Sequence, residues 1–586
     1  MSILNESLAH KLGAAARSQG KADSASALAP ADGQSYVKGS TEQELRYITI
    51  PALLRETVSR FGPREALFFQ ETGERLSYYD FDRDVDALAS GFLALGLEKG
   101  DRIGIWSPNR YEWVLTQFAT ARIGLILVNI NPAYRLSEVE YALNKVGCKA
   151  LVLARRFKSS EYLKMVQQLA PELENAEPGR LNATKLPTLK NVIVMGPEET
   201  PGTFRFEDVK NLGGPAQQLR LSVIESTLSP DDAINIQFTS GTTGAPKGAT
   251  LSHYNIVNNA GFVTGRIKLT EADRLCIPVP LYHCFGMVMG TLGAVSKGAA
   301  MVFPGEAFEP AGTLKTLSKE RCTAVYGVPT MFVAMLQELE QNPVDLSSLR
   351  TGIMAGAPCP IDVMERVNSR MNMKDVTICY GMTETSPVSF QSFVDDPTDK
   401  RCATVGRVHP HLEVKIIDAE GQIVPVGGQG ELCTRGYSVM KGYWDDDTRS
   451  EEAIIDGWMH TGDLATFDHD GFCTIVGRVK DMIIRGGENI YPREIEEFLF
   501  RHPEIAEVQV FGVPHEKLGE EVCAWVVARK NADLPEDAVR QFCQGQIAHY
   551  KIPKHVRIVD EIPMTITGKP QKFVMRDQMV AMLQSP

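Results

Sequence analysis

The sequence predicts an α/β protein with a large N-terminal domain, a β-rich subdomain and a small α+β C-terminal domain. Strands and helices alternate from about residue 75, which is typical of parallel or mixed sheets with flanking helices. After about residue 410, short strands separated by Gly and Asp turns indicate antiparallel β structure. A compact α+β pattern follows residue 480 and is about the size of one small domain.

Hydrophobic periodicity assigns the elements of the first part. Helices are predicted at 85–95, 111–121 and 137–147, the last with a Ser137 cap and a closing Gly147. Residues 155–225 are less regular. The predicted strands are RIGIWS (102–107), LILVNI (125–130), KALVLA (149–154), INIQFTS (234–240), AAMVFPG (299–305), TAVYGV (323–328) and DVTICYG (375–381).

The later elements are shorter and differ in kind. The predicted strands of the β-rich part are EVKIID (413–418), GELCTRG (430–436) and CTIVGR (473–478). In the last hundred residues, helices are predicted at 492–503 and 535–550, and strands at 505–514 and 521–530. No repeat of fixed period is present.

Composition limits the function classes. The 586 residues carry a formal net charge of −12, which argues against a general nucleic-acid binder and against attachment to anionic lipid by charge alone. Apolar residues make up 43% and charged residues 23%, as in ordinary globular proteins. The length favours three to five structural units, at roughly 100–200 residues each.

Cysteines, the N-terminus and one apolar stretch bear on the compartment. The 11 cysteines include no CxxC pair and lie mostly in apolar stretches, which predicts buried, reduced thiols. Residues 1–45 are expected to be a poorly ordered tail, because Glu6 and Asp23 disfavour a mitochondrial transit peptide. The uncharged stretch 275–296 contains Pro278 and Pro280, which favour a loop and a buried helix over a membrane span.

The most informative segment is TSGTTGAPKG (239–248), which follows the predicted strand INIQF. Small glycine and hydroxyl residues allow backbone amides to approach phosphate oxygens, and Lys247 adds a cation. The glycine spacing and Gly248 after Lys247 exclude a Walker A motif, and GxGxxG does not match either. The loop therefore predicts phosphate binding outside the usual NTPase and dinucleotide classes.

This segment resembles the phosphate loop of the adenylate-forming superfamily, which includes acyl- and aryl-CoA synthetases, luciferases and peptide-synthetase adenylation domains. Four later segments resemble its other motifs in the same order, and the likeness covers roughly residues 50–586. These segments are YGMTET (380–385), TGD (461–463), GRVKD (477–481) and TGK (567–569). The resemblance implies an N-terminal adenylation domain (46–479), a mobile C-terminal lid domain (480–586), and ATP, Mg²⁺ and CoA as reactants or cofactors.

The resemblance also implies roles around the nucleotide. Glu384, just after a strand end, is expected to hold Mg²⁺ together with Thr239, since Mg²⁺ prefers hard oxygen ligands. Tyr380 offers a face for adenine, and Asp463 and Arg478 are the expected ribose contacts. The remaining expected nucleotide contacts are Ser240, Gly241, Thr242, Thr243, Gly244, Lys247, Gly356, Ala357, Pro358, Gly381, Met382 and Thr383.

The C-terminal part carries the residues expected to change place during the reaction. The resemblance assigns Lys569 to the adenylation step, where an ammonium stabilises charge that develops on the phosphoryl oxygens. Pro570 follows it, where relatives commonly carry Ile or another β-branched residue. Lys480 occupies the hinge position. Just past the hinge, Gly486, Gly487 and Glu488 are expected to line the route of the CoA pantetheine.

The predicted activity is an ATP-dependent fatty acid–CoA ligase, with a medium-chain acid favoured. His283, in PLYHCFG (280–286), is expected to contact the carboxylate or to gate the acyl tunnel, and the apolar run 285–289 suits an alkyl tail. Alternatives are a ligase for aryl or other carboxylic acids, an enzyme that loads a carrier protein, a luciferase-like oxidative enzyme, and a catalytically inactive acyl- or nucleotide-binding protein. The intact Thr239, Glu384, Asp463, Arg478 and Lys569 disfavour the last. A cytoplasmic location is expected, with the mitochondrial matrix as the alternative, and a homodimer is left open.

Overall fold

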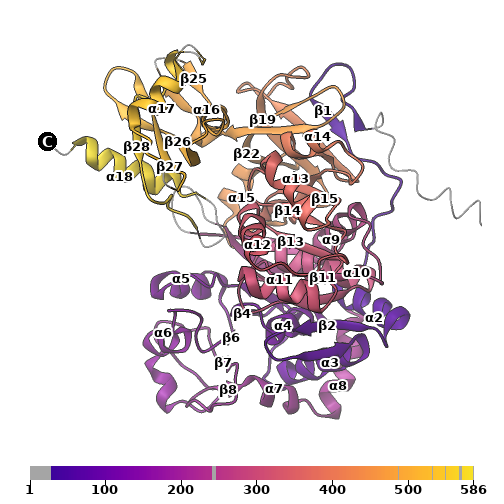
Figure 1. Cartoon of the computed structure of the whole chain (residues 1–586). Coiled ribbons are helices and arrows are strands. Elements are labelled where there is room, and N and C mark those ends of the chain that lie inside the picture. Colours follow the sequence, from indigo (N-terminus) through magenta and orange to yellow (C-terminus); the bar gives the residue numbers. More distant parts are fainter. Residues whose placement is uncertain are drawn as a thin grey trace, which may run out of the picture.

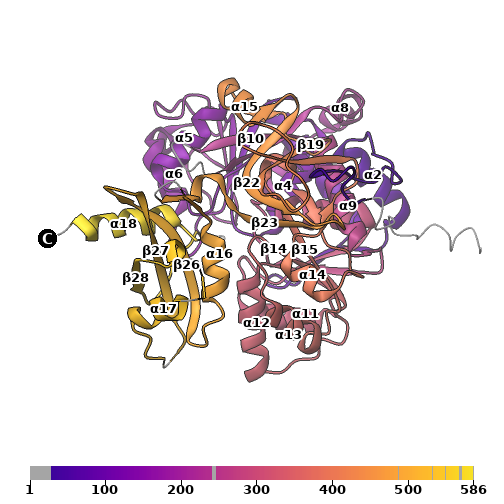
Figure 2. The same ribbon diagram turned by 90° about the horizontal axis from the view of Figure 1, so that it is seen from above.

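The computed structural model describes residues 28–239, 246–485, 488–530, 532–544, 546–547, 549–565 and 570–584, without the side chains of 488 and 489. The described residues form four sheets, three in the N-terminal part and one in the C-terminal part (Figure 1). The C-terminal part projects from one side of the N-terminal part, and the view from above shows the same offset (Figure 2). The predicted α/β architecture is therefore confirmed.

The first sheet contains the strand that leads into the glycine-rich loop. Its order is β20-β10-β9-β5-β4-β6-β7-β8, parallel from β9 to β8 and antiparallel at β10 and β20. The strands are β4 (Arg102–Trp106), β5 (Ile126–Asn129), β6 (Ala150–Leu153), β7 (Asn191–Val194), β8 (Phe204–Arg205), β9 (Ala233–Thr239), β10 (Lys247–Ser252) and β20 (Gly442–Tyr443).

The second sheet has the order β17-β16-β15-β14-β13-β11-β12-β2-β3 and is parallel from β15 to β2. Helices α11 (Pro310–Lys319), α12 (Pro329–Gln341) and α13 (Ile361–Arg370) cover one of its faces through a common apolar cluster. The strands are β2 (Glu65–Phe69), β3 (Glu74–Ser77), β11 (Arg274–Cys276), β12 (Ala300–Phe303), β13 (Ala324–Gly327), β14 (Thr351–Ala355), β15 (Asp375–Gly381), β16 (Val388–Gln391) and β17 (Arg407–Val408).

The third sheet is the predicted β-rich subdomain and is antiparallel throughout. Its strands are β1 (Tyr36–Lys38), β18 (Leu412–Ile417), β19 (Gly430–Gly436), β21 (Ile454–Ile455), β22 (Trp458–Phe467) and β23 (Cys473–Arg478). Because β1 pairs with β18, the prediction of a poorly ordered tail is wrong for residues 36–38. Residues 1–27 lie outside the described part.

The fourth sheet belongs to the C-terminal part and has the order β25-β24-β27-β26, with β28 parallel to β27. Its strands are β24 (Ile483–Arg485), β25 (Glu488–Ile490), β26 (Ile505–His515), β27 (Gly519–Ala528) and β28 (His555–Ile558). The side chain of Arg493 donates to the carbonyl of Ile475 in β23, which joins this part to the third sheet. The boundary at 479/480 falls in the short 3₁₀ turn Val479–Asp481 and stays a prediction.

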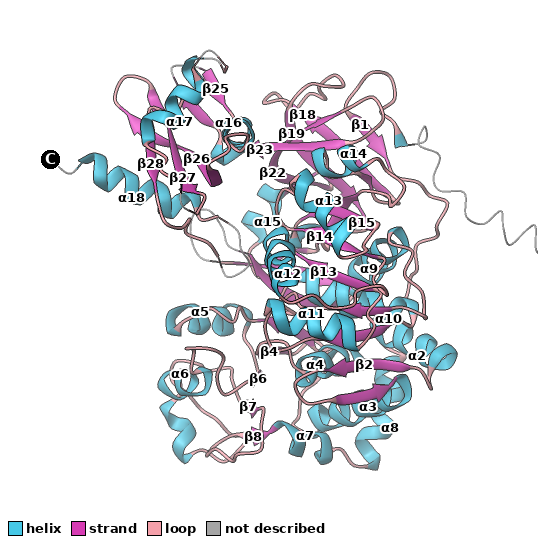
Figure 3. Ribbon diagram, in the orientation of Figure 1, coloured by secondary structure: helices cyan, strands magenta, loops and turns pink. Residues whose placement is uncertain are grey.

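Helices flank the sheets, as Figure 3 shows. Residues 155–225, which the sequence left irregular, contain three of them. The helices are α2 (Ile50–Phe61), α3 (Tyr78–Ala94), α4 (Tyr111–Arg122), α5 (Leu136–Val146), α6 (Tyr162–Leu169), α7 (Phe206–Leu212), α8 (Pro215–Glu225), α9 (His253–Arg266), α10 (Gly293–Lys297), α11 (Pro310–Lys319), α12 (Pro329–Gln341), α13 (Ile361–Arg370), α14 (Thr398–Ala403), α15 (Asp447–Ala453), α16 (Pro492–Leu499), α17 (Glu536–Cys543) and α18 (Lys572–Gln584).

Three expectations about single segments can be compared with the structure. The 11 cysteines carry no disulfide and ten of them are buried, which confirms the predicted free thiols. The uncharged stretch forms β11, a loop, a π-helix (Phe285–Leu292) and α10. Within the described ranges, no helix combines the length and the apolar character needed to cross a membrane.

A buried ion-pair network holds α2, α3, α4 and α8 together at one end of the N-terminal part. Arg122 is fully buried, and its Nη2 lies 2.5 Å from Asp82 Oδ1. Its other nitrogens lie 3.4 Å from Asp86 and from Glu225. Arg55 also contacts Asp82 and Asp86. The buried guanidinium is thus compensated by three carboxylates from two helices.

We expect Arg122→Met to destabilise the protein by about 3 kcal/mol, because removing one partner leaves buried carboxylates with less compensation. Arg55 limits the loss of stability, because it still pairs with Asp82 and Asp86 in the variant. The measurement is the melting temperature of the variant, with Arg83→Met as the control, since the Arg83 side chain is 66% exposed. An equal, small shift for both variants would contradict the assignment.

Candidate active site

The glycine-rich segment leaves the end of β9 and returns as β10. These strands are antiparallel, and Thr239 lies opposite Lys247 in their register. The Lys247 ammonium sits 4.8 Å from the centre of the Tyr443 ring. Ser240, Gly241, Thr242, Thr243 and Gly244 lie outside the described residues. Both ends of the predicted phosphate loop are therefore brought to one place, next to Tyr443.

Glu384 lies beside the end of β9, although it follows a strand of the other large sheet. It sits in the 3₁₀ turn Thr383–Thr385 after β15 and is 6% exposed. The Thr239 hydroxyl donates to Glu384 Oε1 at 3.2 Å, and the Tyr443 hydroxyl donates to the same oxygen at 3.0 Å. A nearly buried carboxylate among hydroxyls is a hard-oxygen donor set that suits Mg²⁺.

Tyr443 is a site residue that the sequence analysis missed. Burial raises the pKa of Tyr443 above its usual range, and the neighbouring Glu384 raises it further. The phenol therefore stays protonated and donates to the carboxylate. No local signal marks Tyr443, because the two-residue strand β20 acquires its place only by pairing with β10.

Tyr380, Asp463 and Arg478 form a second cluster. Tyr380 ends β15, and its hydroxyl donates to Asp463 Oδ2 at 2.5 Å. Arg478 Nε donates to Asp463 Oδ1 at 3.1 Å, and Asp463 and Arg478 are register partners on β22 and β23. Burial, and then the Asp463 charge, raise the pKa of Tyr380 well above its usual range. Three separate predicted motifs thus meet at one carboxylate.

The segment 356–358 lies next to Tyr380. It follows β14, which pairs in parallel with β15, so Gly356 and Tyr380 lie at the ends of neighbouring strands. Gly356 has a φ of +91°, a conformation that favours glycine. Ala357 is half-buried and Pro358 is exposed. This placement agrees with a slot for a flat ring between the two strand ends.

The turn between Tyr380 and Glu384 is tightly built. A Cβ on Gly381 would lie 1.8 Å from the carbonyl oxygen of Pro387, so only glycine fits there. The Met382 amide donates to that carbonyl at 3.0 Å, and Thr383 opens the 3₁₀ turn. The turn fixes the spacing between the aromatic ring and the carboxylate.

His283 lies on the loop before the π-helix. Its ring centre is 4.0 Å from that of Tyr282, whose carbonyl accepts a hydrogen bond from Asn129 of β5. The sulfur of Met287 accepts from Asn129 and Gln237, at 3.2 Å each. Met287, Val288 and Met289 are buried. The apolar run therefore packs beneath β5 and β9, and only Phe285 of the run is partly exposed.

The residues expected to act from the C-terminal part are only partly described. Lys480 lies exposed in the turn Val479–Asp481, between the third and fourth sheets. Lys569, Gly486 and Gly487 lie outside the described residues, as does the side chain of Glu488. Their roles stay predictions.

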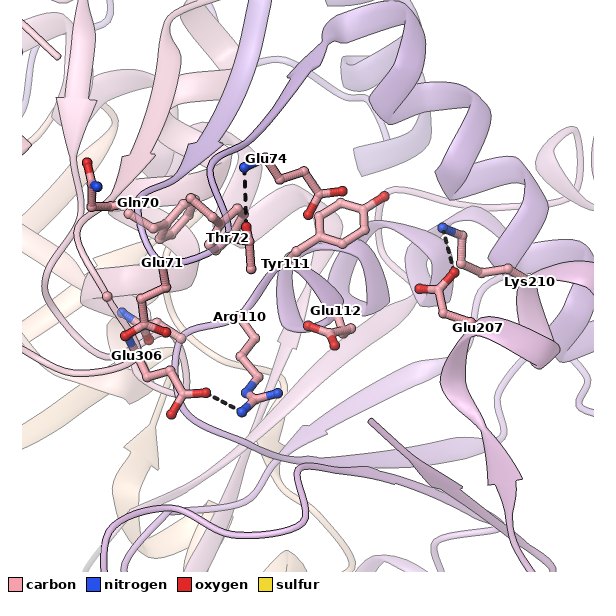
Figure 4. Close-up of a pocket in the computed structure, with 14 residues that line it drawn as sticks. Gln70, Glu71, Thr72, Glu74, Arg110, Tyr111, Glu112, Glu207, Lys210 and Glu306 are labelled. Atoms are coloured by element: carbon pink, nitrogen blue, oxygen red, sulfur yellow. Dashed lines mark hydrogen bonds and ion pairs between the residues drawn. The ribbon is translucent and has the colours of Figure 1, made fainter. Parts of the chain in front are cut away.

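A cavity of about 410 Å³ lies elsewhere, between β2, α4 and α7 (Figure 4). Five glutamates line it (Glu71, Glu74, Glu112, Glu207 and Glu306), against the two cations Arg110 and Lys210. Arg110 pairs with Glu306 and Lys210 with Glu207. Burial raises the pKa of Glu112. The excess of carboxylates disfavours ATP, CoA and fatty acids there.

The fold and the two clusters define the class of protein as an enzyme that binds a nucleotide at the strand ends of an α/β domain. Comparison with known proteins gives the family. The model of AMP-binding enzymes matches residues 54–444, and that of the AMP-binding enzyme C-terminal domain matches residues 494–569. The chain belongs to the AMP-binding enzyme family.

Three relatives illustrate the likeness. The medium-chain acyl-CoA ligase ACSF2, mitochondrial, of Danio rerio is 48% identical, over 93% of this chain and 90% of its own. The putative acyl-CoA synthetase YngI of Bacillus subtilis is 46% identical, over 92% and 98%. The ATP-bound crystal structure of MatB from Rhodopseudomonas palustris has a TM-score of 0.79 and 28% identity, over 92% of this chain and 100% of its own.

Proposed function

We propose that this protein is an ATP-dependent fatty acid–CoA ligase for medium-chain acids. Two clusters carry the proposal: the buried Glu384, held by Thr239 and Tyr443, and the Tyr380–Asp463–Arg478 cluster. Tyr380 precedes Glu384 by only four residues in the chain. The near full-length likeness to a medium-chain acyl-CoA ligase supports the choice of acid.

The nucleotide would lie across these two clusters. Asp463 can accept hydrogen bonds from ribose hydroxyls, Tyr380 and the segment 356–358 would flank the adenine, and Lys247 with the glycine-rich loop would face the phosphates. Glu384 and Thr239 would hold Mg²⁺, which neutralises charge on the phosphate oxygens when it is bound.

The reaction has two halves. A carboxylate oxygen of the acid attacks the α-phosphorus of ATP, the bond to the β-phosphate oxygen breaks, and pyrophosphate leaves. The CoA sulfur then attacks the acyl carbonyl carbon, the thiol proton goes to solvent, and AMP leaves. Lys569 would stabilise charge in the first half. Lys480 would be the hinge residue whose backbone dihedral angles change when the C-terminal domain rotates for the second half-reaction.

The test is a panel of acids assayed with MgATP, with and without CoA. With octanoate or decanoate and CoA, the enzyme is expected to form AMP and acyl-CoA in equal amounts. The kcat/KM for these two acids should exceed that for benzoate or malonate. A preference for benzoate would favour the aryl-acid alternative, and transfer to a phosphopantetheine carrier protein but not to CoA would favour the carrier-loading alternative. No pyrophosphate with any acid would contradict ligase activity.

Two further proposals concern the cellular location and the oligomeric state of the protein. The Danio rerio relative is named mitochondrial, and YngI comes from Bacillus subtilis. We propose a cytoplasmic location. Cell fractionation tests it, because a protein of the mitochondrial matrix would separate together with a matrix marker. Sedimentation of the purified protein distinguishes monomer from homodimer.

We expect Tyr380→Phe to raise the KM for ATP about tenfold, near the lower end of the about 1.5–3 kcal/mol of a hydrogen bond to a charged group. The variant keeps the aromatic ring but removes the donor to Asp463. Tyr437→Phe is the control, because this buried tyrosine bonds Asn259 outside the two clusters. The same KM in wild type and Tyr380→Phe would contradict a role for the Tyr380 hydroxyl in orienting Asp463.

A further inference from the structure

Three side chains of types that can bind metal ions meet beneath the turn that carries Asp463. Glu431 and Cys433 are two residues apart on β19, so they share one face of the sheet, and His460 on β22 is the register partner of Cys433. One ligand atom from each residue lies within 4.8 Å of those of the other two. The three donors therefore converge from two adjacent strands.

The local backbone explains the convergence. The β19–β22 pairing shifts between Glu431 and Cys433, so Thr461, Gly462 and Asp463 of β22 lie opposite the single residue Leu432 and bulge out of the strand. Gly462 has a φ of +69°. The Gly462 amide donates to Glu431 Oε1 at 3.0 Å, which leaves Oε2 directed at His460. Such bulges commonly re-aim side chains beside active sites.

One ligand separation matches that around a tetrahedral metal ion, and the second is about 0.4 Å shorter. Cys433 Sγ lies 3.7 Å from His460 Nδ1, which lies 3.0 Å from Glu431 Oε2. Zinc bond lengths of about 2.3 Å to sulfur and about 2.0–2.1 Å to nitrogen and oxygen give ligand separations of about 3.6 and 3.4 Å. Cys433 and Glu431 both approach the same ring nitrogen, so the three residues do not form a relay across the imidazole.

We propose that Glu431, Cys433 and His460 bind a Zn²⁺ ion, with water as the fourth ligand. A thiolate, an imidazole and a carboxylate suit zinc and do not suit Mg²⁺, which prefers oxygen ligands. The site is therefore chemically distinct from the oxygen site at Glu384. Zinc would displace the Cys433 thiol proton to solvent and tie β19 to β22 at the base of the Asp463 bulge.

Burial and neighbouring charges change the pKa of the Cys433 thiol. Burial raises the pKa of Cys433 to about 12, Glu431 raises it and Lys415 lowers it. Lys415 faces Cys433 from β18, but its ammonium is held 4.5 Å from the Trp458 ring. Arg435 is likewise held over that ring and bonds Glu413. Both cations thus have other partners.

The test titrates the metal-free, full-length protein with Co²⁺, a spectroscopic substitute for Zn²⁺. We expect one bound ion with a sulfur-to-cobalt charge-transfer band and tetrahedral d–d bands, both removed by Zn²⁺. Cys433→Ser should lose the charge-transfer band, and His460→Gln should bind at least about tenfold more weakly. Cys473→Ser, which removes a buried thiol from β23 of the same sheet, should keep the wild-type spectrum.

Two results would overturn the proposal. One is a wild-type protein without the charge-transfer band, and the other is a band that persists in Cys433→Ser. If Cys433→Ser fails to fold, His460→Gln decides, because its side chain is partly exposed, and wild-type affinity in that variant overturns the site. Added Zn²⁺ should also raise the melting temperature of the wild type but not that of His460→Gln. This test uses no acid or CoA, so its outcome is separate from that of the proposed ligase activity.

Discussion

Glu384→Gln is expected to lower kcat/KM for MgATP by about 100- to 1,000-fold, the loss typical of removing one electrostatic contact from a preorganised site. The amide keeps the volume of the side chain and can still accept from Thr239 and Tyr443, which hold Oε1 in the wild type. What it loses is the charge that suits Mg²⁺. The variant should therefore fold normally and require a higher Mg²⁺ concentration.

The measurement is pyrophosphate release at saturating acid over a series of Mg²⁺ concentrations. Glu451→Gln, an exposed glutamate on α15, is the matched control and should behave as wild type. A Glu384→Gln protein with wild-type turnover and an unchanged Mg²⁺ dependence would exclude this carboxylate as the metal ligand.

Lys569→Ala and Lys480→Pro are expected to fail in different half-reactions. Lys569→Ala should lower the rate of adenylation by about 100- to 1,000-fold, with a much smaller effect on ATP affinity, because the ammonium acts mainly in the transition state. Lys480→Pro should form acyl-AMP but transfer it poorly to CoA, because proline fixes φ near −65° at the proposed hinge.

Two assays separate these outcomes. ATP–pyrophosphate exchange measures the first half-reaction, and CoA consumption from supplied acyl-AMP measures the second. If Lys569→Ala blocks thioester formation from acyl-AMP as severely as it blocks exchange, the two half-reactions do not use different lid positions. Equal losses in Lys480→Pro would indicate a destabilised C-terminal domain, which its melting temperature would show.

Much of the fold follows from the sequence because apolar periodicity and turn residues are local signals. The strand predicted at 234–240 is β9, and the antiparallel strands predicted after residue 410 form the third sheet. The errors lie at element ends. Ser137 is inside α5, whose N-cap is Arg135, because Glu138 accepts from the Arg135 amide. Helix α17 ends at Cys543, well before the predicted residue 550.

Some residues of the candidate site could be predicted from the sequence, and others could not. Motif residues such as Tyr380, Asp463 and Arg478 were identifiable from short segments, and the structure brings them together. Tyr443 and Glu431 were not, because their contacts with Glu384 and Gly462 depend on strand pairing over long separations in the chain. Local sequence patterns predict whether a segment is a helix, a strand or a motif. The contacts of its side chains depend on how the strands pair across the sheet.

The most direct test of the proposed chemistry follows one oxygen atom. Decanoate labelled with ¹⁸O in its carboxylate is incubated with MgATP and CoA, and the products are analysed by mass spectrometry. Attack of the carboxylate on the α-phosphorus predicts AMP that carries one ¹⁸O atom, because the bridging oxygen stays with phosphorus when CoA takes the acyl group. Unlabelled AMP, or ADP with the label in inorganic phosphate, would contradict the account.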